Sequence, residues 1–580
     1  PPVAGGALQA TTYVHSGEVA TGAVDLDAGG RAGWNVAFDR TYRSRTMLSS
    51  FLGYGWESAL FVRLRQLPNG DVEYRDGSGE VWRFLKAANG YTAPAALSLK
   101  LTATSSGWRM LDQKTRITTF DGLGRIVSES DQFFDGAGGG NLISYFYDDK
   151  GRLGYVVDPV GRASKVTYFD DCTNTQDCFP DMLREIADWR DRKVGFHYDI
   201  KGNLIAVDKP EARNDGYPSF AQTGGNRPTV HYTYKSTGTT LQEFADLGSD
   251  LETIREPADA TPRVTFHYDD TGTKRDFVRT QEWGTADRPA ATFDFTVASI
   301  TSLPSAVGVT DTRQQRRTYT FSGAVPAGYN ADRPHVQDVT EENVASWSGS
   351  AFGEIPATIS RVNAGDFSSA NRTRTFGYES GRLKSISTTN GASTILGYEN
   401  ASAGDLGGMV HTIDSSGGAG ASSQIINHDN GLAFVASTQA DGTDVLQTPE
   451  PRHDFLSPSA VNAGVTSSSQ IFASGLPHIA TSTGDGPGAQ QKVEYYDGAD
   501  SNLFKRSMPS DVVAGNDEVR AHIDYPSADQ SIERGPRGVT TTTDYDELGR
   551  PIHIRMSGNE LAPEEYFAYD GNGRLARHRR

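Results

Sequence analysis

The heptapeptide YDDKGRL at residues 147–153 contains a tetrad, Tyr147-Asp148 followed by Gly151-Arg152, that returns along the chain. Complete or partial copies comprise Tyr198, Asp199 and Gly202; Tyr268, Asp269 and Gly272; Tyr545, Asp546, Gly549 and Arg550; and Tyr569, Asp570, Gly573 and Arg574. A short unit that recurs in this way indicates a stacked repeat architecture. It also favours a function in containment or contact over a single catalytic pocket.

Each residue of the tetrad has a backbone task in a strand–turn–strand element. The aromatic residue closes a strand, because aromatic side chains fit a pleated, half-buried surface. Asp opens the turn, since its carboxylate can bind backbone N–H groups two residues on, and Gly supplies the positive φ of a short hairpin loop. A second turn follows at Asp158–Gly161, and the cycle restarts at Tyr168. One unit is therefore two strands and about twenty residues.

Residues 147–153, followed by the turn at Asp158–Gly161, resemble the YD repeat of Rhs proteins, teneurins and the TcC subunits of insecticidal toxin complexes. The segments Ser16–Glu18, Phe38–Tyr42 and Leu52–Trp56 resemble the lead-in that precedes YD repeats in bacterial Rhs proteins. The resemblance implies an all-β fold, in which one long, spiralling antiparallel sheet forms part or all of a hollow shell. It also implies that such a shell encloses a toxin or another client polypeptide for delivery.

The composition is typical of a long, turn-rich sheet with one polar face. Only 36% of residues are hydrophobic, yet 10% are aromatic and 63 are Gly, which is too aromatic for a disordered chain. No segment shows a sustained helical period with caps at both ends. Strand twist should make so long a sheet coil.

The charge and the motifs exclude several classes of function. The net charge of -18 argues against a nucleic-acid partner, because such binders normally carry a basic stripe. No apolar run approaches the roughly twenty residues of a membrane span. We find no G-x-S-x-G, H-E-x-x-H or P-loop motif, and therefore expect no enzyme activity, cofactor or metal. The expected partner is an enclosed client or the remainder of the same shell. The alternative is an exported surface or matrix protein that binds glycans or surface proteins.

Two cysteines bear on the compartment. Cys172 and Cys178 are close enough in sequence to staple the loop 173–177 by a disulfide, which would indicate export to the cell surface or medium. The alternative is a pair of reduced thiols in a cytosolic protein. Two cysteines without a nearby histidine do not indicate a zinc site.

The repeats suggest four segments along the chain. Residues 1–65 are the lead-in, 66–275 a regular repeat array, 276–490 degenerate repeat strands with loops, and 491–580 further YD repeats cut off at the C-terminal end. We expect the natural protein to continue beyond Arg580. Within the second segment, residues 241–255 should be a polar insertion, and Asp181–Ala187 a short helical turn.

The recurring polar side chains have both a structural and a functional interpretation. The aspartates fit turn caps better than acid–base pairs, which must lie a few ångströms apart, and this includes the Asp158-Pro159 pair deep in the array. The arginines after Gly could line a binding stripe, but pairing with turn carboxylates is the simpler interpretation. His197, His231 and His267 each precede a Tyr and could bind a metal only within one coordination sphere. These recurring residues are Asp121, Asp148, Asp158, Asp199, Asp269, Asp546 and Asp570, with Arg125, Arg152, Arg162, Arg550 and Arg574.

Overall fold

The computed structural model describes residues 9–580 with internal gaps, of which the longer ones are 28–33, 211–226, 236–248, 322–335, 348–366, 399–409 and 484–490. Within the described residues the chain is almost entirely antiparallel strand, with two short 3₁₀ helices, η1 at Ala59–Phe61 and η2 at Gly272–Lys274. The predicted all-β fold class is confirmed. No helix in this described part has the length and apolar character of a membrane span.

The N-terminal strands form small sheets. The first has the order β1-β2-β3-β6, from β1 (Gln9–Tyr13), β2 (Glu18–Asp27), β3 (Ala37–Arg43) and β6 (Trp56–Glu57). The next joins β7 (Arg63–Gln66), β8 (Val72–Arg75), β9 (Val81–Ala87) and β10 (Gly90–Thr92). Strands β4 (Ser49–Ser50) and β5 (Gly53–Tyr54) pair with each other.

The repeats form one continuous sheet in which every strand pairs with the next strand along the chain. Among the described residues this sheet has 25 strands, β11 to β35. They are β11 (Lys100–Ala103), β12 (Gly107–Leu111), β13 (Ile117–Asp121), β14 (Ile126–Ser130), β15 (Leu142–Tyr147), β16 (Leu153–Val157), β17 (Ala163–Tyr168), β18 (Leu183–Ala187), β19 (Lys193–Tyr198), β20 (Leu204–Asp208), β21 (Thr229–Tyr234), β22 (Leu251–Arg255), β23 (Val264–Tyr268), β24 (Val278–Trp283), β25 (Ala291–Thr296), β26 (Ala306–Thr310), β27 (Arg316–Phe321), β28 (Val336–Trp347), β29 (Phe367–Glu379), β30 (Arg382–Thr388), β31 (Ser393–Tyr398), β32 (Val410–Ser416), β33 (Ser422–Asp429), β34 (Leu432–Thr438) and β35 (Asp444–Leu446).

A further sheet continues the same meander toward the C-terminus. In the described part of the chain it has eleven strands in sequence order. They are β38 (Ala460–Asn462), β39 (Val465–Ile471), β40 (Pro477–Thr483), β41 (Gln491–Tyr495), β42 (Pro509–Ala514), β43 (Val519–Ser527), β44 (Gln530–Arg534), β45 (Thr540–Tyr545), β46 (Pro551–Ser557), β47 (Glu564–Tyr569) and β48 (Leu575–Arg579). Strands β36 (Thr448–Glu450) and β37 (Phe455–Ser457) form a separate pair between the two large sheets.

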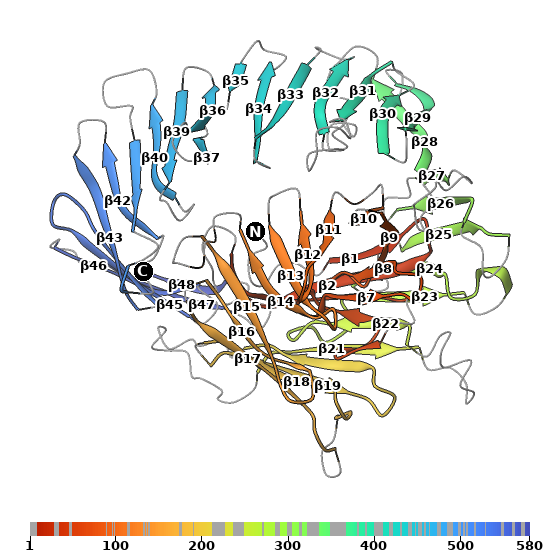
Figure 1. Cartoon of the computed structure of the whole chain (residues 1–580), viewed down its shortest axis with the longest axis horizontal. Helices are drawn as coiled ribbons and strands as arrows, with labels where there is room; N and C mark the ends of the chain where they lie inside the picture. The colour runs from red at the N-terminus through yellow and green to blue at the C-terminus, as the bar shows by residue number, and fades with distance from the viewer. Residues whose placement is uncertain are drawn as a thin grey trace.

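A β-bulge recurs immediately before the aromatic residue of the repeat. The pairing register shifts there at Tyr147, Tyr168, Tyr198, Tyr268, Tyr545 and Tyr569. A bulge bends its strand and increases the local twist, and repeated bulges curve a sheet. Figure 1 shows the result, because the strands follow one another around a curved path.

The main core lies between the N-terminal strands and one face of the repeat sheet. Figure 1 shows β1, β2, β7 and β8 within the curve of β13–β24. Trp56 and Phe38 of the lead-in, with Val156, Tyr198 and Ile254 of the repeats, belong to one buried cluster. The lead-in therefore covers the inward face of the repeats.

The structure corrects two expectations about local structure. Asp181–Ala187 is not a helical turn, since Leu183–Ala187 forms β18 between β17 and β19. Residues 251–255 are likewise the strand β22 and not part of an insertion, while 241–248 lie outside the described residues. In both strands a bulge lets residues three apart, such as Leu183 and Ile186, face the core together. That spacing imitates a helical period.

Candidate functional site

The repeat turn is a closed hydrogen-bonded unit built on its aspartate. In the turn 148–152, Oδ1 of Asp148 accepts hydrogen bonds from the backbone N–H groups of Lys150 (3.0 Å) and Arg152 (2.7 Å), and Oδ2 accepts one from Arg152 Nε (2.9 Å). Gly151 lies at φ 77° and donates its N–H to the Asp148 carbonyl. Burial alone would raise the pKa of Asp148, but the hydrogen bonds from Arg152 outweigh burial and hold that pKa below its ordinary value. Both oxygens of this carboxylate are thus engaged by its own turn.

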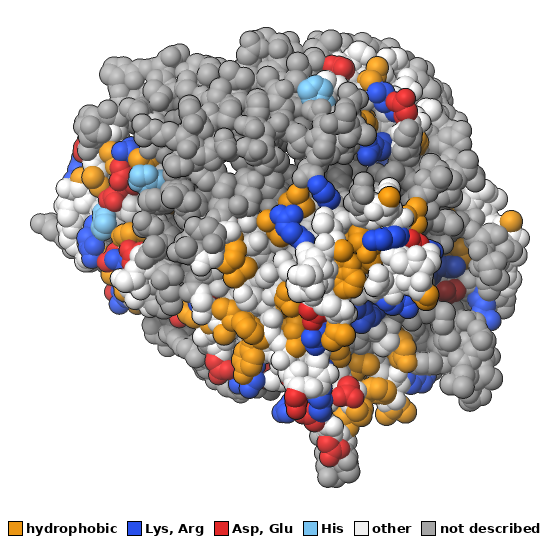
Figure 2. Space-filling view, viewed as in Figure 1, with side chains coloured by type: hydrophobic (Ala, Val, Ile, Leu, Met, Phe, Trp, Pro, Cys, Tyr) orange, Lys and Arg blue, Asp and Glu red, His pale blue; other side chains and the backbone are white. Residues whose placement is uncertain are grey.

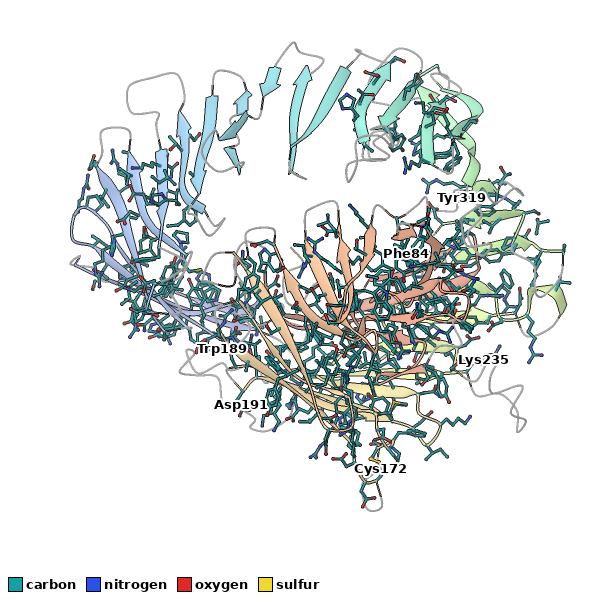
Figure 3. All side chains as sticks on the ribbon, in the orientation of Figure 1. Phe84, Cys172, Trp189, Asp191, Lys235 and Tyr319 are labelled. Atoms are coloured by element: carbon teal, nitrogen blue, oxygen red, sulfur yellow. A yellow bond between two sulfur atoms is a disulfide. The ribbon has the colours of Figure 1, made fainter. Side chains whose placement is uncertain are left out.

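The same design recurs in other turns. Arg Nε donates to the aspartate four residues earlier in the pairs Arg125–Asp121, Arg162–Asp158, Arg192–Asp188 and Arg550–Asp546. Asp191, labelled in Figure 3, stands in the place of glycine at φ 61°. In the turn after Tyr198, Asn203 replaces arginine and donates to Asp199, with Gly202 at φ 86°.

An arginine–tyrosine contact links neighbouring strands in several of the repeats. The guanidinium carbon of Arg152 lies 4.6 Å from the ring centre of Tyr168, and the Tyr168 hydroxyl donates to the carbonyl of Leu153 at 3.0 Å. Equivalent sets are Arg125, Tyr147 and Ile126, and Arg550, Tyr569 and Pro551. A cation–π contact of this kind contributes about 0.5–2 kcal/mol. We call this combination of turn, stacked ring and carbonyl the repeat lock.

Three predicted repeat positions depart from this pattern. The loop after Tyr268 is longer than a hairpin turn, because Gly272 begins η2 and Asp269 exchanges backbone hydrogen bonds with Asp276 and Phe277. The Tyr198 hydroxyl donates to the lead-in carbonyl of Phe51 (3.3 Å) and not to a neighbouring repeat. The Tyr545 hydroxyl lies 3.1 Å from Ser531 Oγ. Four predicted residues lie outside the described residues, namely Gly549, Asp570, Gly573 and Arg574.

The three histidines do not meet in one place. His197 Nε2 lies 2.8 Å from Asp208 Oδ2, and His231 lies in the same row across the sheet, with Ala206 between them. His267 pairs with Thr280 outside this row. Among the described residues, no three His, Cys, Asp or Glu side chains are grouped closely enough to hold a metal ion.

The lead-in attaches to the repeats through a buried arginine of the segment Phe38–Tyr42, whose partners in the repeats the sequence did not indicate. Arg40 is 1% exposed, and its Nε lies 2.5 Å from Asp25 Oδ2. It donates a hydrogen bond of 2.7 Å to the Tyr232 hydroxyl, and its guanidinium carbon lies 4.7 Å from the Trp56 ring centre. Burial alone would lower the pKa of Arg40, but the charge of Asp25 outweighs burial and raises that pKa. This cluster joins the lead-in to β21.

Backbone contacts extend the same interface. Tyr42 Oη accepts from the N–H of Leu251 at 2.9 Å and donates to the carbonyl of Ser249 at 2.6 Å. Gly53 lies at φ 98°, and a Cβ there would stand 2.5 Å from the carbonyl oxygen of Gly202. The glycine of a repeat turn thus contacts the lead-in without an intervening side chain.

A pair of carboxyl groups lies beside this interface. Asp250 is fully buried and precedes Leu251, the place that Arg152 has before Leu153. Burial and the adjacent Asp276 raise the pKa of Asp250 well above its ordinary value, while Lys235 and Arg45 oppose the shift. Two carboxyl groups in contact cannot both ionise readily, which is the physical cause of the contribution of Asp276 to this shift.

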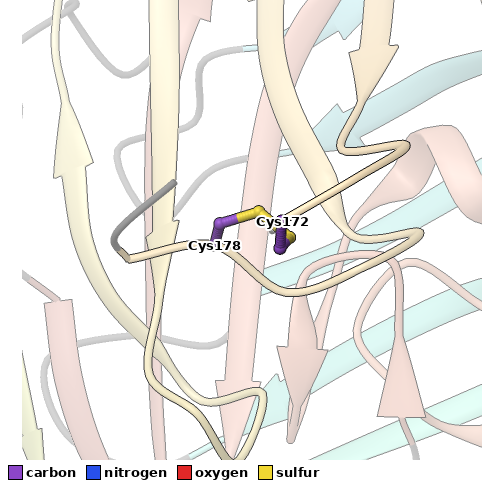
Figure 4. The surroundings of a disulfide bond; sticks show 2 residues. All are labelled: Cys172 and Cys178. Carbon is purple, nitrogen blue, oxygen red and sulfur yellow. A yellow bond between two sulfur atoms is a disulfide. The ribbon is translucent and has the colours of Figure 1, made fainter. Parts of the chain in front are cut away.

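The two cysteines form a disulfide on a loop between β17 and β18 (Figure 4). Their Cα atoms lie 5.7 Å apart. The loop is anchored to β19, because the Tyr198 N–H donates to the carbonyl of Asp177 at 2.9 Å. The bridge therefore fixes a loop that is attached to the repeat sheet.

The comparisons with known proteins bear first on the lead-in. A protein-family model described as a domain of unknown function, DUF6531, matches residues 13–84. The matched segment includes the residues that resemble the Rhs lead-in, which is consistent with the YD-repeat resemblance. A comparison with curated protein sequences finds no match.

Solved structures give long but distant similarities. The chain is similar to the crystal structure of TcdB2–TccC3, with 10% identity and a TM-score of 0.33 over 96% of this chain and 28% of that chain. It is also similar to the Photorhabdus luminescens Tc holotoxin pore, with 9% identity and a TM-score of 0.33 over 96% of this chain and 27% of that chain. The chain thus spans less than a third of the length of these two structures.

Proposed function

We propose that this chain is a non-enzymatic wall segment of a YD-repeat shell that encloses a toxin or another client polypeptide for delivery. The observation that supports this most directly is the repeat lock, which recurs from Arg125 to Arg550 and builds a curved sheet from local contacts. The carboxylates of the turns at Asp121, Asp148, Asp158 and Asp546 are held by the arginine of their own turn. The mechanism is physical, because a curved wall separates its client from solvent and from other proteins.

The lead-in has a defined part in this proposal. Its buried Arg40 and Trp56 attach it to the inward face of the repeats, where it would close the wall on one side. The disulfide between Cys172 and Cys178 supports export, since such bonds persist in oxidising compartments. The remainder of a longer shell, or a second chain, would complete the enclosure.

Native purification of the full-length protein tests enclosure. We expect a second polypeptide, or a terminal segment of the same chain, that resists added protease until the shell is unfolded. Arg40→Ala should expose this client, because it loosens the lead-in, whereas Arg65→Ala on exposed β7 should not. If no protected polypeptide accompanies a shell shown by small-angle scattering to be curved and intact, the containment proposal is wrong.

The alternative is an exported surface protein that binds glycans or proteins through its sheet. One pair of side chains favours it: Phe146 and Tyr155 pair across β15 and β16, and are 53% and 45% exposed. Figure 2 shows hydrophobic side chains interspersed with charged ones over these strands. Exposed aromatic rings suit contacts with partners that are partly apolar. A glycan array that detects binding to the wild type but not to Phe146→Ala would support this alternative.

A further inference from the structure

A groove crosses the face of the repeat sheet that points away from the lead-in. It has a volume of about 600 Å³ and lies over β19–β22. Its axis follows a row of paired residues, His197, Ala206, His231 and Arg255. The row spans three strand spacings, or about 14 Å. The groove does not depend on whether the shell encloses a client.

A small side chain contributes to the hollow. Ala206 lies between the two histidines and lines the groove. Its methyl group leaves space that a larger side chain would occupy in a sheet face. The neighbouring residues of these strands, such as Val207 and Val230, point into the core on the opposite face. The groove therefore lies on the face of these strands that is turned away from the core.

Asp208, one of two aspartates that line the groove, already has partners. His197 Nε2 lies 2.8 Å from Asp208 Oδ2, and Thr229 Oγ1 donates to Asp208 Oδ1 at 2.7 Å. The hydrogen bond to Asp208 raises the pKa of His197. Burial alone would raise the pKa of Asp208, but these two partners outweigh burial and lower it. Both oxygens of this carboxylate are thus engaged within the groove.

The arginine that lines the groove, Arg255, lacks such partners in the described part of the chain. Among the described residues Arg255 has no carboxylate or hydrogen-bond partner for its guanidinium, although it is partly buried. Burial and the charge of Arg255 lower the pKa of His231. The imidazole of His231 lies beside Arg255 in the row and offers a hydrogen-bonding nitrogen. Arg255 is therefore the group of the groove that can pair with an added carboxylate.

We propose that this groove binds an acidic peptide segment, with a side-chain carboxylate paired to Arg255 and hydrogen-bonded by His231. A guanidinium binds a carboxylate through two parallel hydrogen bonds. A single guanidinium suits this monoanion better than a dianionic phosphate, and the repulsion by Asp177, which also lines the groove, is weaker for a monoanion. Tyr232 is only 4% exposed and offers no ring on which a sugar could stack, and the length of the groove fits an extended segment.

Fluorescence anisotropy with labelled tetraglutamate, at low ionic strength, tests the assignment on the full chain. We expect saturable binding that is weakened about ten-fold or more by Arg255→Gln, a loss of at least about 1.4 kcal/mol. Arg255→Lys should bind with intermediate affinity, because it keeps the charge but loses the two-pronged geometry. Labelled tetraglutamine should not bind, and Arg65→Gln should bind as the wild type does.

The pH dependence separates this site from general charge attraction. Lowering the pH through the pKa of His231 adds a positive charge, so tetraglutamate binding should tighten, and His231→Gln should lose this dependence. Equal binding by the wild type and a folded Arg255→Gln variant would overturn the proposal. Binding of tetragalacturonate without binding of tetraglutamate would also overturn it, since the carboxylate would then come from a sugar.

Discussion

The repeats around β16–β17 and those around β46–β47 share one lock but differ in what covers them. Arg152 and Arg550 hold their turn aspartates in the same way, and their side chains are 12% and 10% exposed. Tyr168 is nevertheless buried under the lead-in, while Tyr569 is only half-buried. In the described part of β38–β48 the buried apolar residues are Val513, Ala521 and Ala568 alone. The repeat lock therefore depends only on contacts between neighbouring repeat strands, whereas the burial of the first region comes from the lead-in.

Removal of the buried Arg40 guanidinium should give the largest difference in stability between the two regions. Arg40→Ala leaves Asp25 buried without its partner, so the free energy of unfolding of the N-terminal region should fall by about 3–5 kcal/mol. Hydrogen exchange should rise in β21 and remain unchanged in β45–β48. The double variant Arg40→Met with Asp25→Leu should recover much of the loss. Equal changes in exchange in both regions would contradict a local role for the lead-in.

Substitution of turn glycines should give the next largest difference in stability between the two regions. At Gly124 (φ 78°) an added Cβ would stand 2.0 Å from the carbonyl oxygen of Leu64, whereas at Gly538 (φ 74°) nothing lies within 4 Å. Gly538→Ala should cost only the left-handed backbone strain, about 1 kcal/mol. Gly124→Ala should cost about 2–4 kcal/mol, because the clash adds to the same strain. Similar midpoints in denaturant for the two variants would show that the lead-in does not constrain the turn.

The carboxyl groups of the two regions should respond to pH with opposite signs. The folded-state pKa of Asp250 is raised, so its cost to stability appears as pH rises from the unfolded-state value through the folded pKa. Asp250→Asn should therefore stabilise the protein near pH 7, by on the order of 1 kcal/mol, and have no effect at strongly acidic pH. The groups that face Asp250 are Asp276, Lys235, Arg45, Tyr42 and Tyr268.

Asp524 in the C-terminal sheet is the matched control. Its hydrogen bond from Lys505 lowers its pKa, so its contribution is present above the unfolded-state pKa and is lost as pH falls through the folded one. Asp524→Asn should lower the melting temperature slightly near pH 7 and have no effect in acid. A pH profile of the same sign for both asparagine variants would contradict the assignment of Asp250.

Substitution of the arginine of the repeat lock should have the smallest effect on stability, and this effect should be the same in both regions. Arg152→Gln and Arg550→Gln each lose the ion pair with the turn aspartate and one cation–π contact. Arg152→Gln also loses the pairs with the exposed Asp170 and Asp181, which contribute little, so each variant should cost about 1 kcal/mol. Chemical denaturation of the two variants measures this. A loss at Arg152 alone would mean that the lock needs the lead-in, and the comparison would then rest on one region only.

The sequence predicts the local part of this structure well and the long-range part poorly. The tetrad at Tyr147 contains the chemistry of strand end, turn cap and positive φ, so the all-β fold follows from residues that are adjacent in the chain. The contact of Arg40 with Tyr232 joins residues 192 positions apart, and no periodicity links them. The helical turn predicted at Asp181–Ala187 was wrong because a bulge imitated a helical spacing. The groove at Arg255 depends on register between strands, which Ala206 alone does not reveal.

The bulge before each repeat aromatic has a consequence for size. Each unit adds a similar change of direction, so the arc lengthens in proportion to the number of units while the radius stays the same. Duplication or deletion of one unit outside the region that the lead-in contacts would alter the length of the wall without displacing those contacts. The number of units thus sets the length of the wall, and this length can vary independently of stability.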